Sequence, residues 1–147
     1  MKKIFCLLMV AVLTVILVGC TTSLTYTYTV ETGDVIEVKL NTTNDLSMSH
    51  KPPIEITRND THLSDVIFIE KATYENYFSA AQTSENAVVL ENAEKDGNKY
   101  LMWCYAGREW NYVLLVGDSE TGVLIGNAVS EESARECFEA LTFSLAD

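Results

Sequence analysis

Alternating apolar and polar positions predict that the chain after residue 24 begins with a β-hairpin. Threonine and tyrosine alternate over residues 25–30, as in a strand with two different faces. Residues 35–41 alternate as well, and a Thr-Gly-Asp turn joins the two segments. The apolar face of the second strand carries Ile36, Val38 and Leu40. The pattern therefore predicts two antiparallel strands that turn one face toward a core.

The middle of the chain changes character at two prolines. Residues 42–53 are mostly polar and end in a Pro-Pro pair, which bars a regular helix or a central strand there. A short strand is expected at residues 54–57. Residues 66–69 are apolar at every position, which is typical of a central strand that is covered on both faces.

Two segments have the helical period. In residues 73–82, Thr73 is suited to cap the helix, and one apolar stripe consists of Tyr74, Tyr77, Phe78 and Ala81. A second helix is expected after Ser130, which can cap it, with two glutamates at its positive end. Its apolar stripe consists of Ala134, Cys137, Phe138 and Leu141. The chain then ends in an extended tail.

Four more strands are expected between the helices, at residues 87–94, 99–106, 110–116 and 123–127. The dipeptide Asp96-Gly97 favours a tight hairpin turn, because both residues tolerate positive φ. Gly107-Arg108 fits a second two-residue turn. The pattern predicts one α+β domain over residues 25–147, an antiparallel sheet of about six to eight strands packed with two helices.

The first twenty residues have a different organisation. Two lysines precede an uninterrupted run of uncharged, mainly apolar residues at 4–18, which is typical of a secretory signal and short for a spanning helix. The run ends in Leu17-Val18-Gly19-Cys20, which resembles a bacterial lipobox. The resemblance implies cleavage after residue 19 and acyl chains, palmitate among them, on Cys20. Several chains would hold a protein stably at a membrane surface.

This resemblance divides the chain into a signal at residues 1–19, the lipidated Cys20 with a short tether at residues 20–24, and the domain. It implies a place on the bacterial cell membrane, facing outside the cytoplasm. Without the signal, eight basic residues remain against 21 acidic ones, a net charge of −13. Such a surface repels nucleic acid, so no nucleic-acid partner is expected.

The order of elements from residue 66 to residue 145 resembles the PsbP/Mog1-like family of small domains. A strand, a helix, a four-stranded meander, a second helix and a Phe-Ser tail follow one another as in that family. The resemblance implies a sandwich-like fold and a binding or accessory role, because such domains share no catalytic activity. No site residue can be transferred, since no site motif matches.

Catalytic and metal-binding motifs are not found in the sequence. It has no Gly-x-Ser-x-Gly elbow, phosphate-binding glycine loop, Cys-x-x-Cys or clustered Cys/His spacing. His50 and His62 are expected in polar loops. We therefore expect no enzyme activity, no catalytic residue, no cofactor and no metal. Cys104 and Cys137 could form a disulfide outside the cytoplasm, or remain two buried thiols.

One aromatic ladder is the candidate binding face. A two-residue turn at residues 107–108 places Tyr105 opposite Trp110, and the next pair on the same face is then Trp103 with Tyr112. This face is either core under a helix or under the N-terminal hairpin, or the lining of a groove in which the turn arginine meets an anionic group. The candidate residues are Trp103, Tyr105, Arg108, Trp110 and Tyr112.

Two functions remain open on this basis. The first is a lipid-anchored, non-catalytic accessory or interaction domain with a protein partner in the cell envelope. The second is a small-ligand-binding lipoprotein that uses the aromatic face of the hairpin at residues 100–116. The first predicts a mostly filled core without a deep polar pocket, and the second predicts a concave pocket lined by the ladder.

Overall fold

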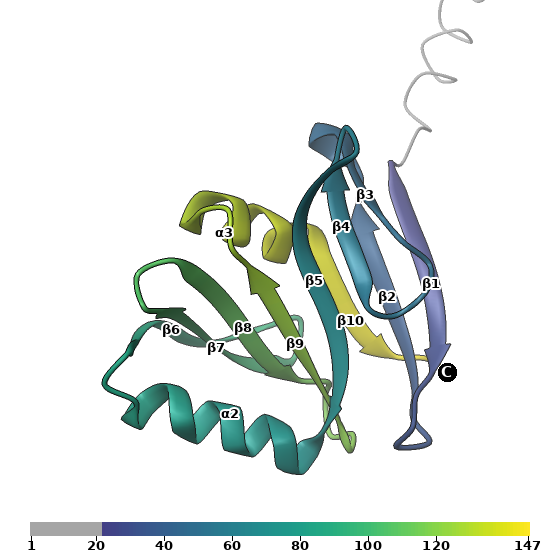
Figure 1. The fold of residues 1–147 in the computed structure, drawn as a ribbon. Coiled ribbons are helices and arrows are strands. Elements are labelled where there is room, and N and C mark those ends of the chain that lie inside the picture. Colours follow the sequence, from purple (N-terminus) through teal and green to yellow (C-terminus); the bar gives the residue numbers. More distant parts are fainter. Residues whose placement is uncertain (1–21) are drawn as a thin grey trace, which may run out of the picture.

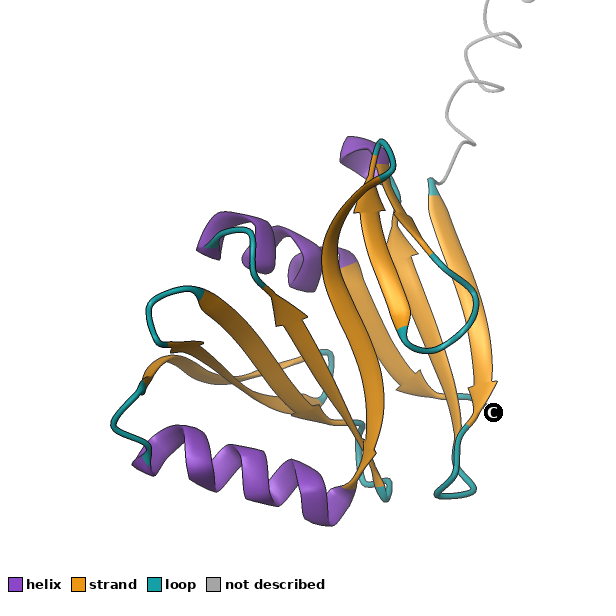
Figure 2. Cartoon of the chain, viewed as in Figure 1, coloured by secondary structure: helices purple, strands orange, loops and turns teal. Residues whose placement is uncertain are grey.

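The computed structural model describes residues 22–147, which form ten strands, a short 3-10 turn and two α-helices (Figure 1). The class is α+β, as predicted, and the strands pair antiparallel in two separate sheets (Figure 2). The predicted signal segment, the lipobox and Cys20 lie outside the described residues. Of the predicted tether, Ser23 already belongs to the first strand.

The smaller sheet contains three strands in the order β1-β2-β10. β1 (Ser23–Thr29) and β2 (Val35–Asn41) form the predicted hairpin, and β10 (Leu141–Leu145) pairs with the other edge of β2. The alternation in β2 has the expected effect, since Ile36, Val38 and Leu40 are all fully buried. The expected C-terminal tail is therefore a strand of this sheet.

The larger sheet contains seven strands in the order β3-β4-β5-β9-β8-β7-β6. Its members are β3 (Leu46–Met48), β4 (Ile54–Arg58), β5 (Thr61–Glu70), β6 (Ala87–Lys95), β7 (Asn98–Tyr105), β8 (Glu109–Leu115) and β9 (Thr121–Asn127). Up to Val66, β5 is internal to the sheet and has β4 and β9 as neighbours. The prediction of a central strand covered on both faces at residues 66–69 is therefore only partly correct, because β4 ends beside Val66 and Ile67 is 37% exposed.

The large sheet separates two cores. One face packs against the small sheet and α3 (Glu131–Ala140), and this core includes Ile36, Val66, Tyr112 and Phe138. The other face packs against α2 (Lys71–Thr83), where Tyr74 and Ala81 of the helix meet Leu101, Trp103 and Val113 of the sheet. In Figure 1, α2 and α3 accordingly lie on opposite sides of β8 and β9.

Two details of the helices follow from local chemistry. Ser130 caps α3 as predicted, because its hydroxyl oxygen accepts a hydrogen bond from the N–H of Ser133 at 3.0 Å. The predicted cap of the other helix is wrong: α2 begins at Lys71, directly after β5, and Thr73 lies inside its first turn. Gly122 of β9 lets α2 approach closely, since a Cβ there would lie 2.9 Å from Cβ of Tyr74.

The prediction of one sheet with six to eight strands was incomplete. β3 falls in the polar segment for which the sequence predicts no strand, and β10 corresponds to the predicted extended tail. Both pair through long-range contacts, β3 with β4 and β10 with β2. Strands as short as β3, with three residues, carry too few alternations to be recognised in a sequence.

Candidate functional site

The predicted aromatic ladder does not exist, because the register of its hairpin is shifted by one residue. Tyr105 lies opposite Glu109 and Trp103 lies opposite Asn111. The turn contains three residues, 106–108, since Ala106 also adopts a positive φ of 52° next to Gly107 at 68°. The N–H of Ala106 donates to the carbonyl of Asn86 at 2.8 Å, which fixes this extra turn residue.

The shift places the predicted face residues on two sides of the sheet. Trp103 is buried under α2, where Tyr77 stacks on it with ring centroids 6.2 Å apart. Tyr112 is buried on the opposite side against Phe138 of α3, with centroids 4.0 Å apart and planes at 12°. Because a one-residue slip sends alternate side chains to the other face, the two rings cannot share a ligand.

The other three candidates also fail to form a site. Trp110 lies on the same face of the sheet as Tyr112, on the α3 side, and is half-buried. Tyr105 and Arg108 lie at the exposed tip of the hairpin. The structure therefore divides the five candidate residues among a helix-covered core, a second core and an exposed turn.

Both cysteines of the domain are free thiols in the structure, so the disulfide alternative is not realised there. Cys104 is half-buried near the end of β7, whereas Cys137 is fully buried on α3. Burial raises the pKa of the Cys137 thiol, which opposes formation of the reactive thiolate. Of the two thiols, Cys104 is the more accessible one.

The two histidines have different surroundings. His50 lies in the loop before β4, as predicted, but His62 lies on β5 and not in a loop. Its Nε2 pairs with Oδ1 of Asp65 at 2.9 Å, and Glu55 of β4 completes a group whose ligand-type atoms lie within 4.8 Å of one another. All three side chains are exposed. The hydrogen bond accounts for the contact between His62 and Asp65, and the absence of a metal stays a prediction.

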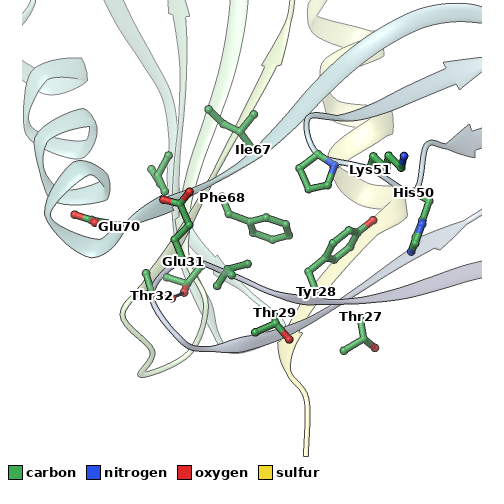
Figure 3. Close-up of a pocket in the computed structure, with 14 residues that line it drawn as sticks. Thr27, Tyr28, Thr29, Glu31, Thr32, His50, Lys51, Ile67, Phe68 and Glu70 are labelled. Carbon is green, nitrogen blue, oxygen red and sulfur yellow. Dashed lines mark hydrogen bonds between the residues drawn. The ribbon is translucent and has the colours of Figure 1, made fainter.

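A pocket of about 510 Å³ lies between the two sheets, at the side where β1 faces β5 (Figure 3). One wall comes from the end of β1 and the turn after it, at residues 27–32. The other wall comes from residues 67–70 of β5, and the loop at residues 50–52 borders the pocket. This volume is within the range of small-molecule sites in proteins.

The pocket exists because β4 is much shorter than β5. The pairing of β4 with β5 ends at Ile54 and Val66, so within the described part of the chain the last four residues of β5 pair only with β9. The chain before Ile54 leaves the sheet through a cis peptide bond between Pro52 and Pro53. The position that a longer β4 would occupy is therefore open.

Two aromatic rings form the floor of the pocket. Tyr28 of β1 and Phe68 of β5 contact each other with centroids 5.3 Å apart. The Tyr28 side chain is 8% exposed, and its hydroxyl has no hydrogen-bond partner among residues 22–147. Burial raises the pKa of this hydroxyl, and the neighbouring Tyr26 adds to the effect, so it stays protonated. A buried hydroxyl without a partner is costly, and a bound group can reach this oxygen only if the side chains that cover it move.

Charged side chains lie at the two ends of the pocket. Glu31 and Glu70 lie at one end, and Lys51 lies at the other, next to His50 (Figure 3). The histidine ring also packs against Tyr26, with centroids 4.7 Å apart, which holds the loop close to β1. The arrangement suits an elongated ligand with an apolar middle and charges of opposite sign at its ends.

Hydrogen bonds between the two sheets support the end of the pocket at which Glu31 and Glu70 lie. Oδ2 of Asp34 accepts from the Thr121 hydroxyl at 2.7 Å and from the N–H of Glu120 at 3.1 Å. The hydroxyls of Thr32 and Thr121 are 2.6 Å apart. These contacts tie the β1–β2 turn of the small sheet to the start of β9 in the large sheet. The pocket wall is therefore fixed across the gap between the sheets.

Sequence patterns did not indicate this pocket. Its lining comes from two strands about forty residues apart and from the polar loop that precedes β4. The only related signal is the Pro-Pro pair before residue 54, which bars β4 from starting earlier as a central strand.

Comparison with known proteins gave no match to a family model, to a curated protein or to a solved structure. In the described part of the chain, neither helix is both long enough and apolar enough to cross a membrane.

Proposed function

We propose that this protein is a lipid-anchored, non-catalytic interaction domain on the outer side of the bacterial cell membrane, and that it binds its partner at the pocket between β1 and β5. The observation that carries the proposal is this pocket, with its aromatic floor and the unpartnered hydroxyl of Tyr28. Elsewhere, the aromatic residues that the sequence offered for binding pack largely within the two cores.

The position of the pocket fits an anchor at Cys20. β1 begins at Ser23, only three positions after the lipobox cysteine, and the pocket lies at the opposite end of this strand. Six residue steps along a strand span about 20 Å. With acyl chains on Cys20, the pocket would thus face away from the point of attachment and remain open to an envelope protein.

The proposed kinship with PsbP/Mog1-like domains rests on the order of the elements from β5 to β10. That order is strand, helix, four-stranded meander, helix and final strand. It supports an accessory role, since the resemblance brings no catalytic residues with it. The resemblance thus supports binding in general, whereas the place of the binding site rests on the pocket between β1 and β5.

A second candidate is the binding of a small ligand in the same pocket. The register of β7 and β8 divides the aromatic residues of the hairpin between two faces, so they do not form one binding face. The volume of about 510 Å³ and the Tyr28 hydroxyl instead favour a ligand in the pocket between β1 and β5. A small ligand and a protein segment would compete for this space, so the two candidates can be separated by experiment.

The test uses the full chain expressed in its own host. Ile67 lines the pocket and is 37% exposed, so Ile67→Lys changes the pocket without opening a core; Val88→Lys, at a residue 62% exposed on β6, is the matched control. After crosslinking in intact cells, the wild type and Val88→Lys should recover one and the same protein, and Ile67→Lys should lose it. Equal recovery by all three variants would contradict the pocket as the binding site.

The anchor is tested separately. Metabolic labelling with palmitate should mark the wild type and not Cys20→Ser, and only the wild type should partition into a detergent phase. Labelling that persists in Cys20→Ser would overturn the proposed lipid attachment. A soluble but folded Cys20→Ser protein that still binds the partner would leave the pocket proposal intact.

A further inference from the structure

The wall of the pocket on the side of β5 is a free strand edge. Up to Val66, β5 has neighbours on both sides, but among residues 22–147 only β9 pairs with Ile67, Phe68, Ile69 and Glu70. In an antiparallel sheet, alternate residues direct their N–H and C=O groups to alternate sides. Every second residue of this segment therefore turns its backbone hydrogen-bonding groups toward the pocket. A free edge of this kind is a template for another strand.

The opposite wall is an edge strand as well. β1 pairs with β2 along its whole length, and within residues 22–147 no strand pairs with its other side. β1 and β5 run in the same direction on the two sides of the gap (Figure 1). A segment that runs antiparallel to β5 would thus also be antiparallel to β1. It would have the same direction as β4 and would occupy the position beside β5 that β4 leaves open.

We propose that the pocket binds an extended peptide segment of a partner protein, which adds to the free edge of β5 at Ile67–Glu70 as an antiparallel strand. This inference rests on the proposed function and names the chemistry of the partner. Four residues of β5 correspond to a contact about 13 Å long. Backbone hydrogen bonds would give affinity, and alternate side chains of the peptide would pack on Tyr28 and Phe68, as in other cases of strand addition.

The charges at the pocket ends set the polarity of the peptide. A strand antiparallel to β5 has its N-terminal end beside Glu70 and Glu31, and its C-terminal end beside His50 and Lys51. The peptide should therefore carry a basic residue before the apolar alternation and an acidic residue after it. The opposite order would place like charges together at both ends.

The probe for this inference is a phage-displayed library of random twelve-residue linear peptides, selected on the full-length protein in nanodiscs. Selected peptides should alternate apolar and polar residues, with a basic N-terminal and an acidic C-terminal flank. Their affinity for Ile67→Lys should fall at least tenfold, and for Val88→Lys it should not change. Selection on the double variant Glu31→Lys, Glu70→Lys should exchange the basic N-terminal flank for an acidic one.

N-methylation of the selected peptide tests the backbone contacts directly. Methylation at alternate residues should weaken binding at least tenfold, and methylation at the residues between them should have little effect. Strand addition is overturned if no peptide is selected, if peptide affinity does not depend on Ile67, or if the effect of methylation on affinity does not alternate along the peptide. It is also overturned if native mass spectrometry finds a lipid or metabolite on the wild type that Ile67→Lys lacks.

These outcomes are distinguishable from failure of the proposed function. If crosslinking in cells recovers a partner that depends on Ile67, but no peptide shows the alternating pattern, the interaction domain stands and strand addition falls. If neither a partner nor a peptide depends on Ile67, both proposals fall together.

Discussion

Asp34 and Thr121 connect the two sheets near the end of the pocket that carries Glu31 and Glu70: the Thr121 hydroxyl donates a hydrogen bond to Oδ2 of Asp34 at 2.7 Å. The same carboxylate oxygen accepts the N–H of Glu120 at 3.1 Å. Asp34 follows the turn of the β1–β2 hairpin, and Thr121 is the first residue of β9 and fully buried. One carboxylate thus fixes the distance between the turn that borders the pocket and the large sheet.

Replacing Asp34 by Ala should therefore destabilise the domain. The change removes the acceptor and leaves the buried Thr121 hydroxyl without this partner, which costs about 1–3 kcal/mol. Thermal and urea unfolding of the full-length protein would measure the loss. Asp118→Ala is the matched control, because Asp118 is an exposed carboxylate in the neighbouring β8–β9 loop and should cost little. Equal stability of the two variants would contradict the role given to Asp34.

Removing the Tyr28 hydroxyl should not destabilise the domain, in contrast to the loss of the Asp34 carboxylate. Since this buried group has no partner among the described residues, Tyr28→Phe should leave the free energy of unfolding unchanged or raise it. Tyr100→Phe is the control, because the Tyr100 hydroxyl donates to Glu91 at 3.1 Å and its loss should cost about 1 kcal/mol.

The same variant should weaken binding at the pocket. The prediction is that the bound peptide gives the Tyr28 hydroxyl the hydrogen-bond partner that it lacks in the free protein. Peptides selected on the wild type should therefore bind Tyr28→Phe less tightly, although its unfolding midpoint is not lower. A destabilised Tyr28→Phe protein with undiminished peptide affinity would contradict both parts of this prediction.

Most of the fold was predictable from local patterns, because the strands and helices alternate in hydrophobicity over several residues. β2 and its buried Ile36, Val38 and Leu40 follow directly from the period of two. Assignment to two sheets was not predictable, since it depends on β10 pairing with β2 across a separation of about one hundred residues. Nothing in the composition of residues 141–145 distinguishes a paired strand from an extended tail.

The candidate site was predicted wrongly because one residue decided the register. Ala106 adopts a positive φ, which alanine rarely does, and its N–H is held by the carbonyl of Asn86. Glycine at 107 suggested a shorter turn, and the resulting slip placed Trp103 and Tyr112 on the same face. The real pocket depends instead on where β4 stops beside β5, a tertiary feature that a sequence shows only indirectly through Pro52-Pro53.

The two cysteines of the domain should differ sharply in reactivity. In the folded protein without reductant, iodoacetamide should modify Cys104 first, because Cys137 is fully buried and burial raises the pKa of its thiol. In denaturant, still without reductant, both should react, which intact-mass measurement would show as a second adduct. Failure of both thiols to react in denaturant until a reductant is added would demonstrate a disulfide.

The last prediction concerns the ion pair between Arg58 of β4 and Glu136 of α3. The hydrogen bond and charge of Arg58 lower the pKa of the Glu136 carboxyl below its usual range. A carboxyl whose pKa is lower in the folded state stabilises the protein above its unfolded-state pKa, about 4.3, and loses this contribution as the pH falls through the folded-state value. Glu136→Gln should therefore lower the unfolding midpoint at pH 7.

The difference between wild type and Glu136→Gln should shrink below about pH 4 and vanish in stronger acid, where both side chains are neutral. Glu85→Gln is the matched control, because Glu85 is exposed in the loop after α2 and should show little change at any pH. Thermal unfolding from pH 3 to pH 8 measures the effect. If Glu136→Gln lowers the midpoint by the same amount at pH 3 and at pH 7, the variant acts through packing, and the ion pair does not stabilise the junction between α3 and β4.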